Sequence, residues 1–485
     1  MDTKINSNKE LNIWEALIPV FALIIMLGYN VYIFGDSALG GSNQFILLLG
    51  AAVAAIVGFF NKVSFQKMMD EVAENVRSTN GAILILLMVG ALAGTWLVSG
   101  IIPSMIYYGL QILSPAIFLP ATLIICAVIS IATGSSWTTS ATVGIALIGI
   151  GGALGFPVGM VAGAVISGAY FGDKLSPMSD TTNLAPAMAG TDLFTHIKYM
   201  SLTTTPTFIV SLILFIILGL TVETTGIADS SALLADIEKS FNITPWLFLV
   251  PVTVIGLIIK KTEPLIALLI GTLLAAIFAI IFQPEIVLML SGGKSLNFAN
   301  AYKGVLNAIT TKSIVPTDNT TLADLFTSGG MEKMLGTIWL IICAMVFGGV
   351  MDAIGALARI SQALLSLAKS TFGLFAATVG SCLALNITAS DQYLAIVVPG
   401  KMFAKAYKDK GLAPENLSRT LEDSGTVTSV LIPWNTCGAY QSGTLGVDTF
   451  DYLPYAFFNL LSPVMTLIFA AFNIKIRQLV SDIKS

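Results

Sequence analysis

Stretches of predominantly apolar residues, each long enough to cross a bilayer as a helix, recur along the whole chain. A crossing helix needs about 20 such residues. Among the 485 residues, 55% are hydrophobic and only 11% are charged, whereas a soluble protein has roughly a quarter charged residues. We therefore predict an all-α polytopic membrane protein. Hydropathy predicts single crossings at 14–34, 43–60, 81–103, 157–174, 203–223, 246–260, 264–283, 333–357, 419–440 and 454–474.

Two further apolar regions, 117–155 and 372–406, are each long enough for two passes but contain polar clusters. These clusters are TGSSWTTS at 133–140 and NITASDQ at 386–392. In hydrocarbon, an unwound backbone must be buried in protein or line a water-filled cavity. Both regions are therefore predicted to contain broken or re-entrant helices, either as hairpins or as paired crossings.

The distribution of Lys and Arg predicts the orientation of the chain. Basic residues collect in 61–80, in 401–419 and in the tail at 475–485, and such loops face the cytoplasm. Segments 104–116 and 440–453 contain no base and are predicted to face outward. Both termini, including 1–13, are then cytoplasmic. The net charge of -4 excludes a basic nucleic-acid-binding protein.

The order of crossings and breaks predicts two inverted repeats, 14–235 and 236–474. The polar breaks align without a gap at an offset of 254, and the segments from Gly172 and Glu422 align at an offset of 250. The second alignment places Asp173 opposite Asp423, and Ser176 opposite Thr426. Inverted repeats with broken helices in corresponding places are typical of secondary transporters with a site near the membrane midplane.

Carboxylates, hydroxyls and amides in the polar segments are the candidate ligands for a hard cation such as Na⁺. Asp173 and Asp423 are the predicted principal titrating or cation-binding groups, with Asp180 and Asp391 in support, although solvated loop residues are the alternative for Asp173 and Asp180. The full set of predicted cation ligands is Asp173, Ser176, Asp180, Thr181, Asn183, Asp391, Asp423 and Thr426. The predicted cavity-lining residues are Ser135, Ser136, Thr139, Asn386, Thr388, Ser390, Asn435 and Thr436.

Enzyme and cofactor motifs find no support in the sequence. SGGKS at 291–295 lacks the leading glycine of a phosphate-binding loop, because position 288 is Leu288. The four cysteines are widely separated and are interpreted as small buried hydrophobic residues. We predict a transporter without a resident cofactor, in which Na⁺ is the transported ion.

Three segments have a distinctive sequence: GSSWTTSATVG from Gly134, GAYFGDKLSPMSDTTNLAPAMAGTDLFTHIKYM from Gly168, and PWNTCGAY from Pro433. They resemble the NhaC family of bacterial sodium/proton antiporters, which also contains malate/lactate antiporters. The resemblance implies a prokaryotic inner membrane, the ion-transporter superfamily, a transport domain moving against a scaffold, and a homodimer. Its polar motifs correspond to Ser135, Ser136, Thr139, Asp173, Ser176, Asp180, Thr181, Asn183, Asp423, Asn435 and Thr436.

Two functions remain open at this level. The first is exchange of Na⁺ for H⁺, because one carboxylate site that accepts either a cation or a proton is sufficient for exchange. The alternative is Na⁺- or H⁺-coupled transport of an organic anion or amino acid, such as malate/lactate antiport. Helix N-termini can hold carboxylates without Arg or Lys, and such N-termini are predicted after residues 134 and 389.

Overall fold

The protein is built almost entirely of helices, as predicted. Its computed structural model describes residues 11–34, 41–222, 230–317 and 320–479. The helices of the first half are α1 Ile13–Phe34, α2 Ser42–Phe60, α3 Phe65–Ser78, α4 Asn80–Val98, α5 Ile101–Ile112, α6 Pro115–Thr133, α7 Ser136–Thr139, the π-helix η2 Ser140–Gly144, α8 Ile145–Ala153, α9 Val158–Leu175, α10 Asp180–Ala189 and α11 Leu193–Thr221.

The second half is also mainly helical and contains a short two-stranded antiparallel sheet. Its elements are α12 Ser230–Ser240, the 3₁₀-helix η3 Pro245–Phe248, α13 Leu249–Ile259, α14 Pro264–Phe282, α15 Pro284–Ser291, α16 Phe298–Thr310, β1 Ser313–Ile314, α17 Thr320–Leu325, β2 Thr327–Ser328, α18 Gly330–Ala353, α19 Ala356–Ser366, α20 Thr371–Thr388, α21 Gln392–Asp409, α22 Pro414–Leu421, the π-helix η4 Glu422–Thr426, the 3₁₀-helix η5 Ser429–Leu431, α23 Thr436–Leu445, α24 Thr449–Tyr452, the 3₁₀-helix η6 Leu453–Tyr455 and α25 Phe457–Ala471. Strands β1 and β2 pair antiparallel, with Ser313 opposite Ser328.

Eight helices in the described residues are long and apolar enough to cross a membrane: α1, α2, α4, α6, α11, α14, α18 and α20. Two bent pairs reach crossing length together, α12 with η3–α13 at 82° and α24–η6 with α25 at 53°. The predicted crossing at 419–440 is wrong as a single helix. There the chain passes through η4 and η5, becomes extended at Ile432, and starts α23 only at Thr436, because Pro433 has no N–H to continue a helix.

The two interrupted regions are pairs of helices joined at sharp backbone breaks. Helix α6 ends at Gly134, which has φ 70°, and Ser135 caps α7 by accepting a hydrogen bond from Thr138 N at 3.1 Å. Helix α20 is followed by Ser390, with φ 59°, and then by Asp391, whose carboxylate accepts from Leu394 N at 3.0 Å. Each break therefore exposes the N-terminus of the helix that follows.

Both halves place their turns and caps in one common register. Gly134 and Ser390, Gly155 and Gly411, and Gly190 and Gly446 are pairs of positive-φ residues, and each pair is 256 positions apart. The N-caps Ser179 and Asn435 share this spacing. The offsets of 254 and 250 read from the letters are therefore wrong.

In the corrected register Asp173 lies opposite Ser429, and Asp423 lies opposite Ser167. The pairings of Asp173 with Asp423 and of Ser176 with Thr426 do not hold. Positive-φ residues and caps fix the register, because they mark where the backbone must turn.

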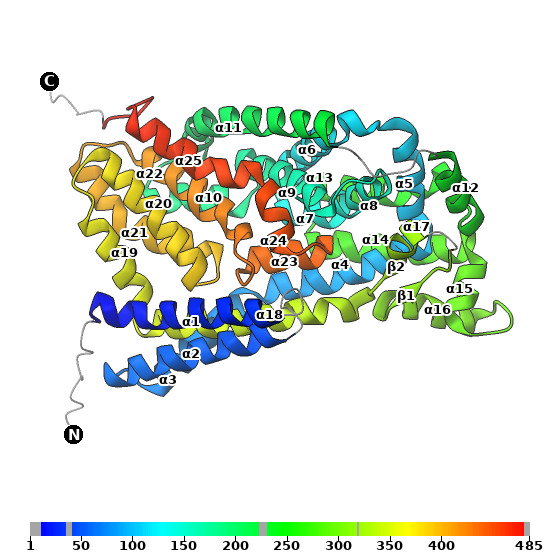
Figure 1. Cartoon of the computed structure of the whole chain (residues 1–485), viewed down its shortest axis with the longest axis horizontal. Helices are drawn as coiled ribbons and strands as arrows, with labels where there is room; N and C mark the ends of the chain where they lie inside the picture. The colour runs from blue at the N-terminus through cyan, green and yellow to red at the C-terminus, as the bar shows by residue number, and fades with distance from the viewer. Residues whose placement is uncertain (1–10, 35–40, 223–229, 318–319, 480–485) are drawn as a thin grey trace.

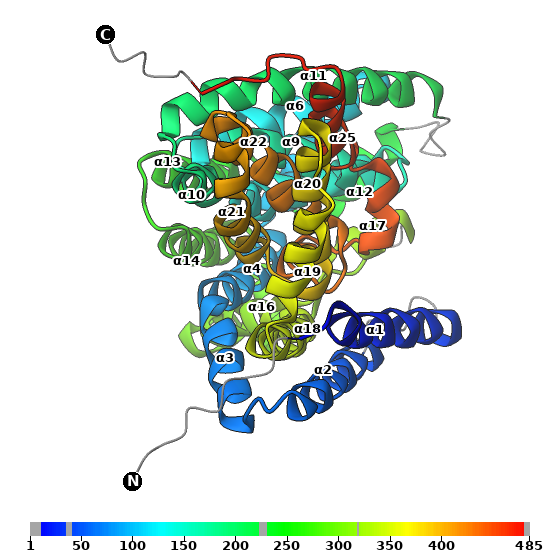
Figure 2. The same cartoon turned by 90° about the vertical axis from the view of Figure 1, so that its left-hand side faces the viewer.

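The helices form two groups. Helices α1, α2, α3 and α18 lie along one side, and α6, α9, α11, α22 and α25 lie on the other (Figures 1 and 2). Helices α6 and α9 approach closely, because residues 162–170 of α9 are mostly small. A Cβ at Gly168 would lie 2.3 Å from the Leu123 carbonyl oxygen. This contact places the C-terminal end of α9 beside the break after α6.

Candidate functional site

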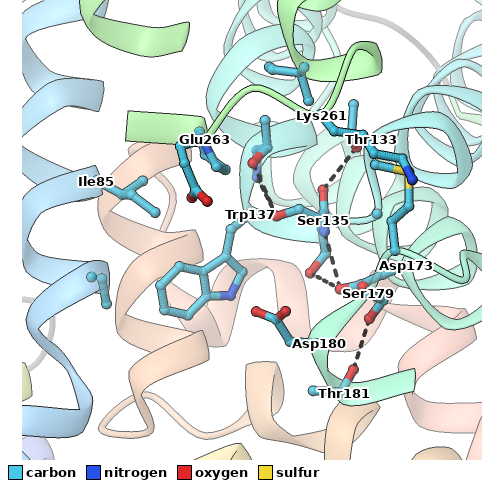
Figure 3. Close-up of a pocket in the computed structure, with 18 of the residues that line it drawn as sticks. Ile85, Thr133, Ser135, Trp137, Asp173, Ser179, Asp180, Thr181, Lys261 and Glu263 are labelled. Carbon is cyan, nitrogen blue, oxygen red and sulfur yellow. Dashed lines mark hydrogen bonds between the residues drawn. The ribbon is translucent and has the colours of Figure 1, made fainter. Parts of the chain in front are cut away.

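A cavity of about 380 Å³ lies where the broken helices meet the N-terminal end of α4 and the α13–α14 loop. Its polar wall is formed mainly by the break after α6, the end of α9 and the start of α10 (Figure 3). The second half contributes Gln392 and Tyr393 from the start of α21. Residues at the start of the helix after each break therefore line the same cavity, and the first N–H groups of these helices donate to Asp173, Ser135 and Asp391.

Asp173 is the most fully buried acidic residue that lines this cavity, with 8% of its surface exposed. Its Oδ2 accepts hydrogen bonds from Ser136 Oγ at 2.7 Å and Ser136 N at 3.1 Å. The carboxylate thus sits at the N-terminus of α7, which favours negative charge. One oxygen is fixed by two donors, and the side chain is held in a defined orientation at the cavity wall.

Asp180 and Glu263 add carboxylates to the more open part of the cavity, where Lys261 is the basic lining residue. Figure 3 shows Asp180 and Glu263 on either side of the Trp137 ring. Trp137 itself stacks on Tyr440 of α23, with ring centroids 4.0 Å apart and an interplanar angle of 14°. Tyr440 also donates to the Trp137 carbonyl at 3.2 Å. This stack joins the α7 break to α23.

Asp423 lies outside the cavity lining and is paired with Lys174. Both side chains are fully buried, and the Lys174 ammonium donates to Oδ1. Oδ2 accepts from Thr203 at 2.8 Å and also from Thr466, while Ser462 lies 3.4 Å from Oδ1. Both oxygens are therefore occupied by protein donors. The structure does not bring Asp173 and Asp423 into one shared site.

The polar residues of the second break mainly bond to one another. Asn386 Nδ2 donates to the Gly425 carbonyl at 2.8 Å, and Asn435 Nδ2 donates to the Asn386 carbonyl at 3.0 Å. Thr436 N donates to the Ser390 carbonyl at 2.9 Å. This network ties the break after α20 to the break before α23, as backbone groups without a helix partner require.

The remaining predicted residues have local roles in the structure. Thr139 and Thr388 hydroxyls donate to carbonyls four residues earlier, Ser135 O and Ala384 O. Asn183 Nδ2 donates to the Ser179 carbonyl at 2.7 Å. Ser176 ends α9, and its Oγ accepts from Met178 N at 3.3 Å.

Of the predicted residues, the cavity gathers Ser135, Ser136, Asp173, Asp180 and Thr181. The predicted set did not include Trp137, Ser179, Lys261, Glu263 and Tyr393, which also line it. One signal was available for two of these: Trp137 and Tyr393 are 256 positions apart, each two residues after the N-cap of its break.

Broken helices that contribute to one polar cavity in a membrane-spanning helical protein define the class of a secondary transporter. The family model described as "Na+/H+ antiporter family" matches residues 168–474, and the chain belongs to this family. Its similarity to the Na⁺/H⁺ antiporter NhaC of Alkalihalophilus pseudofirmus is 37% identity, over 88% of this chain and 90% of the relative.

Two other relatives have names that include organic solutes. The malate-2H⁺/Na⁺-lactate antiporter of Bacillus subtilis is 33% identical over 93% of this chain and 94% of its own length. The arginine/ornithine antiporter ArcD of Halobacterium salinarum is 33% identical over 94% of this chain and 90% of its own length. The family assignment predicted from the sequence is confirmed, and the protein is a multi-pass membrane transporter.

Proposed function

We propose that this transporter exchanges Na⁺ for H⁺ by alternating access across the inner membrane of a prokaryote, with both chain termini in the cytoplasm. The observation behind the proposal is the Asp173 carboxylate at the cavity wall, oriented by the N–H and hydroxyl of Ser136. The wall of the same cavity is rich in hydroxyls, including those of Thr133, Ser135 and Ser179. The antiporter relatives support the same function.

The geometry supports competition between the two ions at one carboxylate. An ionised Asp173 attracts Na⁺, and hydroxyl and carbonyl oxygens are suitable further ligands for a hard cation. A protonated carboxyl has lost the charge that attracts the cation. Na⁺ is thus the cargo of the cavity, not a resident cofactor. Because Ser78 of the basic segment 61–80 lines the cavity, we infer that it opens to the cytoplasm.

Proteoliposomes test this proposal directly. An imposed Na⁺ gradient should move protons in the opposite direction, recorded with an internal pH dye, and Asp173→Asn should abolish that flux. Asp192→Asn is the matched control, because Asp192 is an N-cap of α11 outside the cavity and Asn is also a good cap. Absence of Na⁺-dependent proton movement in the unmodified protein, with or without a small organic acid, would refute the proposal.

The cavity size favours a second candidate function. About 380 Å³ exceeds what a single ion needs and lies within the usual range of small-molecule sites, about 300–1,000 Å³. Coupled transport of an organic acid or amino acid therefore remains the alternative, in keeping with the malate/lactate and arginine/ornithine relatives. Counterflow of labelled malate, lactate, arginine and ornithine separates the two: saturable, Na⁺-dependent uptake supports the alternative.

A homodimer is the proposed assembly, in which a scaffold of each protomer holds the moving transport domain. The two groups of helices in Figure 2 are compatible with this division. Cross-linking in native membranes, followed by mass determination in detergent, tests the dimer. A monomer under both conditions would contradict it.

A further inference from the structure

Glu422, the first residue of η4, is a buried carboxylate with an unused oxygen. Its side chain is fully buried. Oε1 accepts a hydrogen bond from Thr181 Oγ1 at 3.0 Å, and Oε2 has no hydrogen-bond partner within the described part of the chain. The adjacent Asp423 differs in this respect, because its two oxygens accept from Lys174, Thr203 and Thr466.

A second buried oxygen lies beside this carboxylate. Thr426 ends the same π-helix and lies next to the Glu422 carboxylate. Its Oγ1 is buried beside that carboxylate and has no other hydrogen-bond partner among the residues that the structure describes. Single π-helical turns occur frequently at functional sites. Here the turn brings the Glu422 carboxylate and the Thr426 hydroxyl together, and no other described residue bonds to Oε2 or Oγ1.

Hydroxyl groups connect this place to the cavity. Thr181 and Ser179 both line the cavity, and their hydroxyl oxygens are 3.2 Å apart. Figure 3 shows Thr181 below Ser179, which lies next to Asp173. A path of oxygen atoms therefore runs from Asp173 through Ser179 and Thr181 to Glu422. An ion that loses its water in the cavity meets oxygen ligands along this path.

The buried side chains around Glu422 carry more negative than positive charge, which favours the binding of a cation. Asp173, Glu422 and Asp423 are three buried carboxylates. Lys174 donates to Asp423 and Ser462, whereas the buried Arg419 guanidinium packs on the Tyr199 ring and makes no ion pair with any residue that the structure describes. Buried charges are normally paired or bound to a metal ion. A cation at Glu422 would compensate one of the remaining charges.

We propose that Glu422 Oε2 and Thr426 Oγ1, together with Thr181 Oγ1, form a binding site for a monovalent cation at the inner end of the cavity. The hydroxyl of Thr181 can donate to Glu422 and still offer a lone pair to the ion. The inference rests on the proposed function, since it identifies the second carboxylate of the Na⁺ pathway as Glu422 instead of Asp423.

Isothermal titration of the full-length protein in detergent with NaCl, against choline chloride, tests the site. Glu422→Gln and Thr426→Val should each weaken Na⁺ binding about tenfold or more, equal to about 1.4 kcal/mol, and Thr426→Ser should retain it. Glu415→Gln is the control, because Glu415 is a buried carboxylate on the preceding helix that already pairs with Arg477. This control should bind Na⁺ like the unmodified protein.

Two outcomes overturn the inference: unchanged Na⁺ affinity in Glu422→Gln, or in folded Thr426→Val if the first variant does not fold. In either case, the proposed Na⁺/H⁺ exchange would still hold if the unmodified protein showed Na⁺-driven proton flux in proteoliposomes. The proposed exchange itself would be refuted only if the unmodified protein showed no such flux.

Discussion

Lys174→Met should strongly destabilise the protein, because it removes one partner of a fully buried ion pair. The Asp423 carboxylate would keep only hydroxyl donors, from Thr203, Ser462 and Thr466. Removal of one partner of a buried pair costs about 3–5 kcal/mol. With both side chains fully buried, the full range applies, which corresponds to roughly two to four orders of magnitude in the unfolding equilibrium constant.

The double variant Lys174→Met with Asp423→Asn distinguishes the cost of an unpaired buried charge from the cost of lost side-chain packing. Substitution of both partners leaves no uncompensated charge, and replacing a whole buried pair is often neutral. We therefore expect the double variant to recover most of the stability lost in Lys174→Met. Lys198→Met is the control for a lysine substitution on an exposed position of α11, and it should leave stability nearly unchanged.

Unfolding by SDS in mixed micelles, followed by circular dichroism, measures these free energies. The reasoning would be refuted by a loss below about 1 kcal/mol in Lys174→Met, a value typical of an exposed pair. Equal destabilisation of the double and single variants would refute it as well, because the cost would then lie in packing. Either result would mean that Asp423 is not held as an ion by Lys174.

Three further predictions concern packing, capping and the C-terminal tail. Gly168→Ala should lower the free energy of unfolding by about 1–3 kcal/mol, because its Cβ would meet a backbone carbonyl of α6, whereas Gly256→Ala, in open space, should not. Asp391→Ala should cost about 1 kcal/mol as a lost N-cap, and Asp391→Asn should retain both stability and Na⁺ affinity if the residue only caps α21. Glu415→Gln should release the tail from its pair with Arg477, measured as faster trimming by carboxypeptidase; unchanged trimming would contradict this.

The helical framework could be predicted from hydropathy, because crossing length and apolar character are local properties of the sequence. The polar clusters also placed both breaks correctly, near Gly134 and Ser390. The residue-by-residue correspondence between the two halves could not be predicted from the sequence, since few residues are identical. The positive-φ residues and the helix caps show this correspondence, and both are properties of the folded chain.

The site could be predicted only in part for a related reason. Asp173 and Ser136 are in two recognisable polar segments, and the structure joins them. The partner of Asp423 is Lys174, which is 249 positions away. No local sequence pattern predicts a contact between residues so far apart. Which carboxylate is neutralised and which remains available therefore depends on helix packing that the sequence alone does not reveal.

The common register of 256 positions has an evolutionary consequence. Between the segment from Gly134 to Asp192 and the segment from Ser390 to Asp448, the turns and N-caps correspond at this constant offset, which is the pattern expected of a duplicated and fused gene. The buried ionisable residues of the site do not follow this correspondence: Asp173 and Lys174 correspond to Ser429 and Val430, while Glu422 and Asp423 correspond to Ile166 and Ser167. The two segments therefore share the positions of their backbone turns, whereas the buried charged side chains lie at different positions in each, so that neither segment alone holds the full set of buried charges.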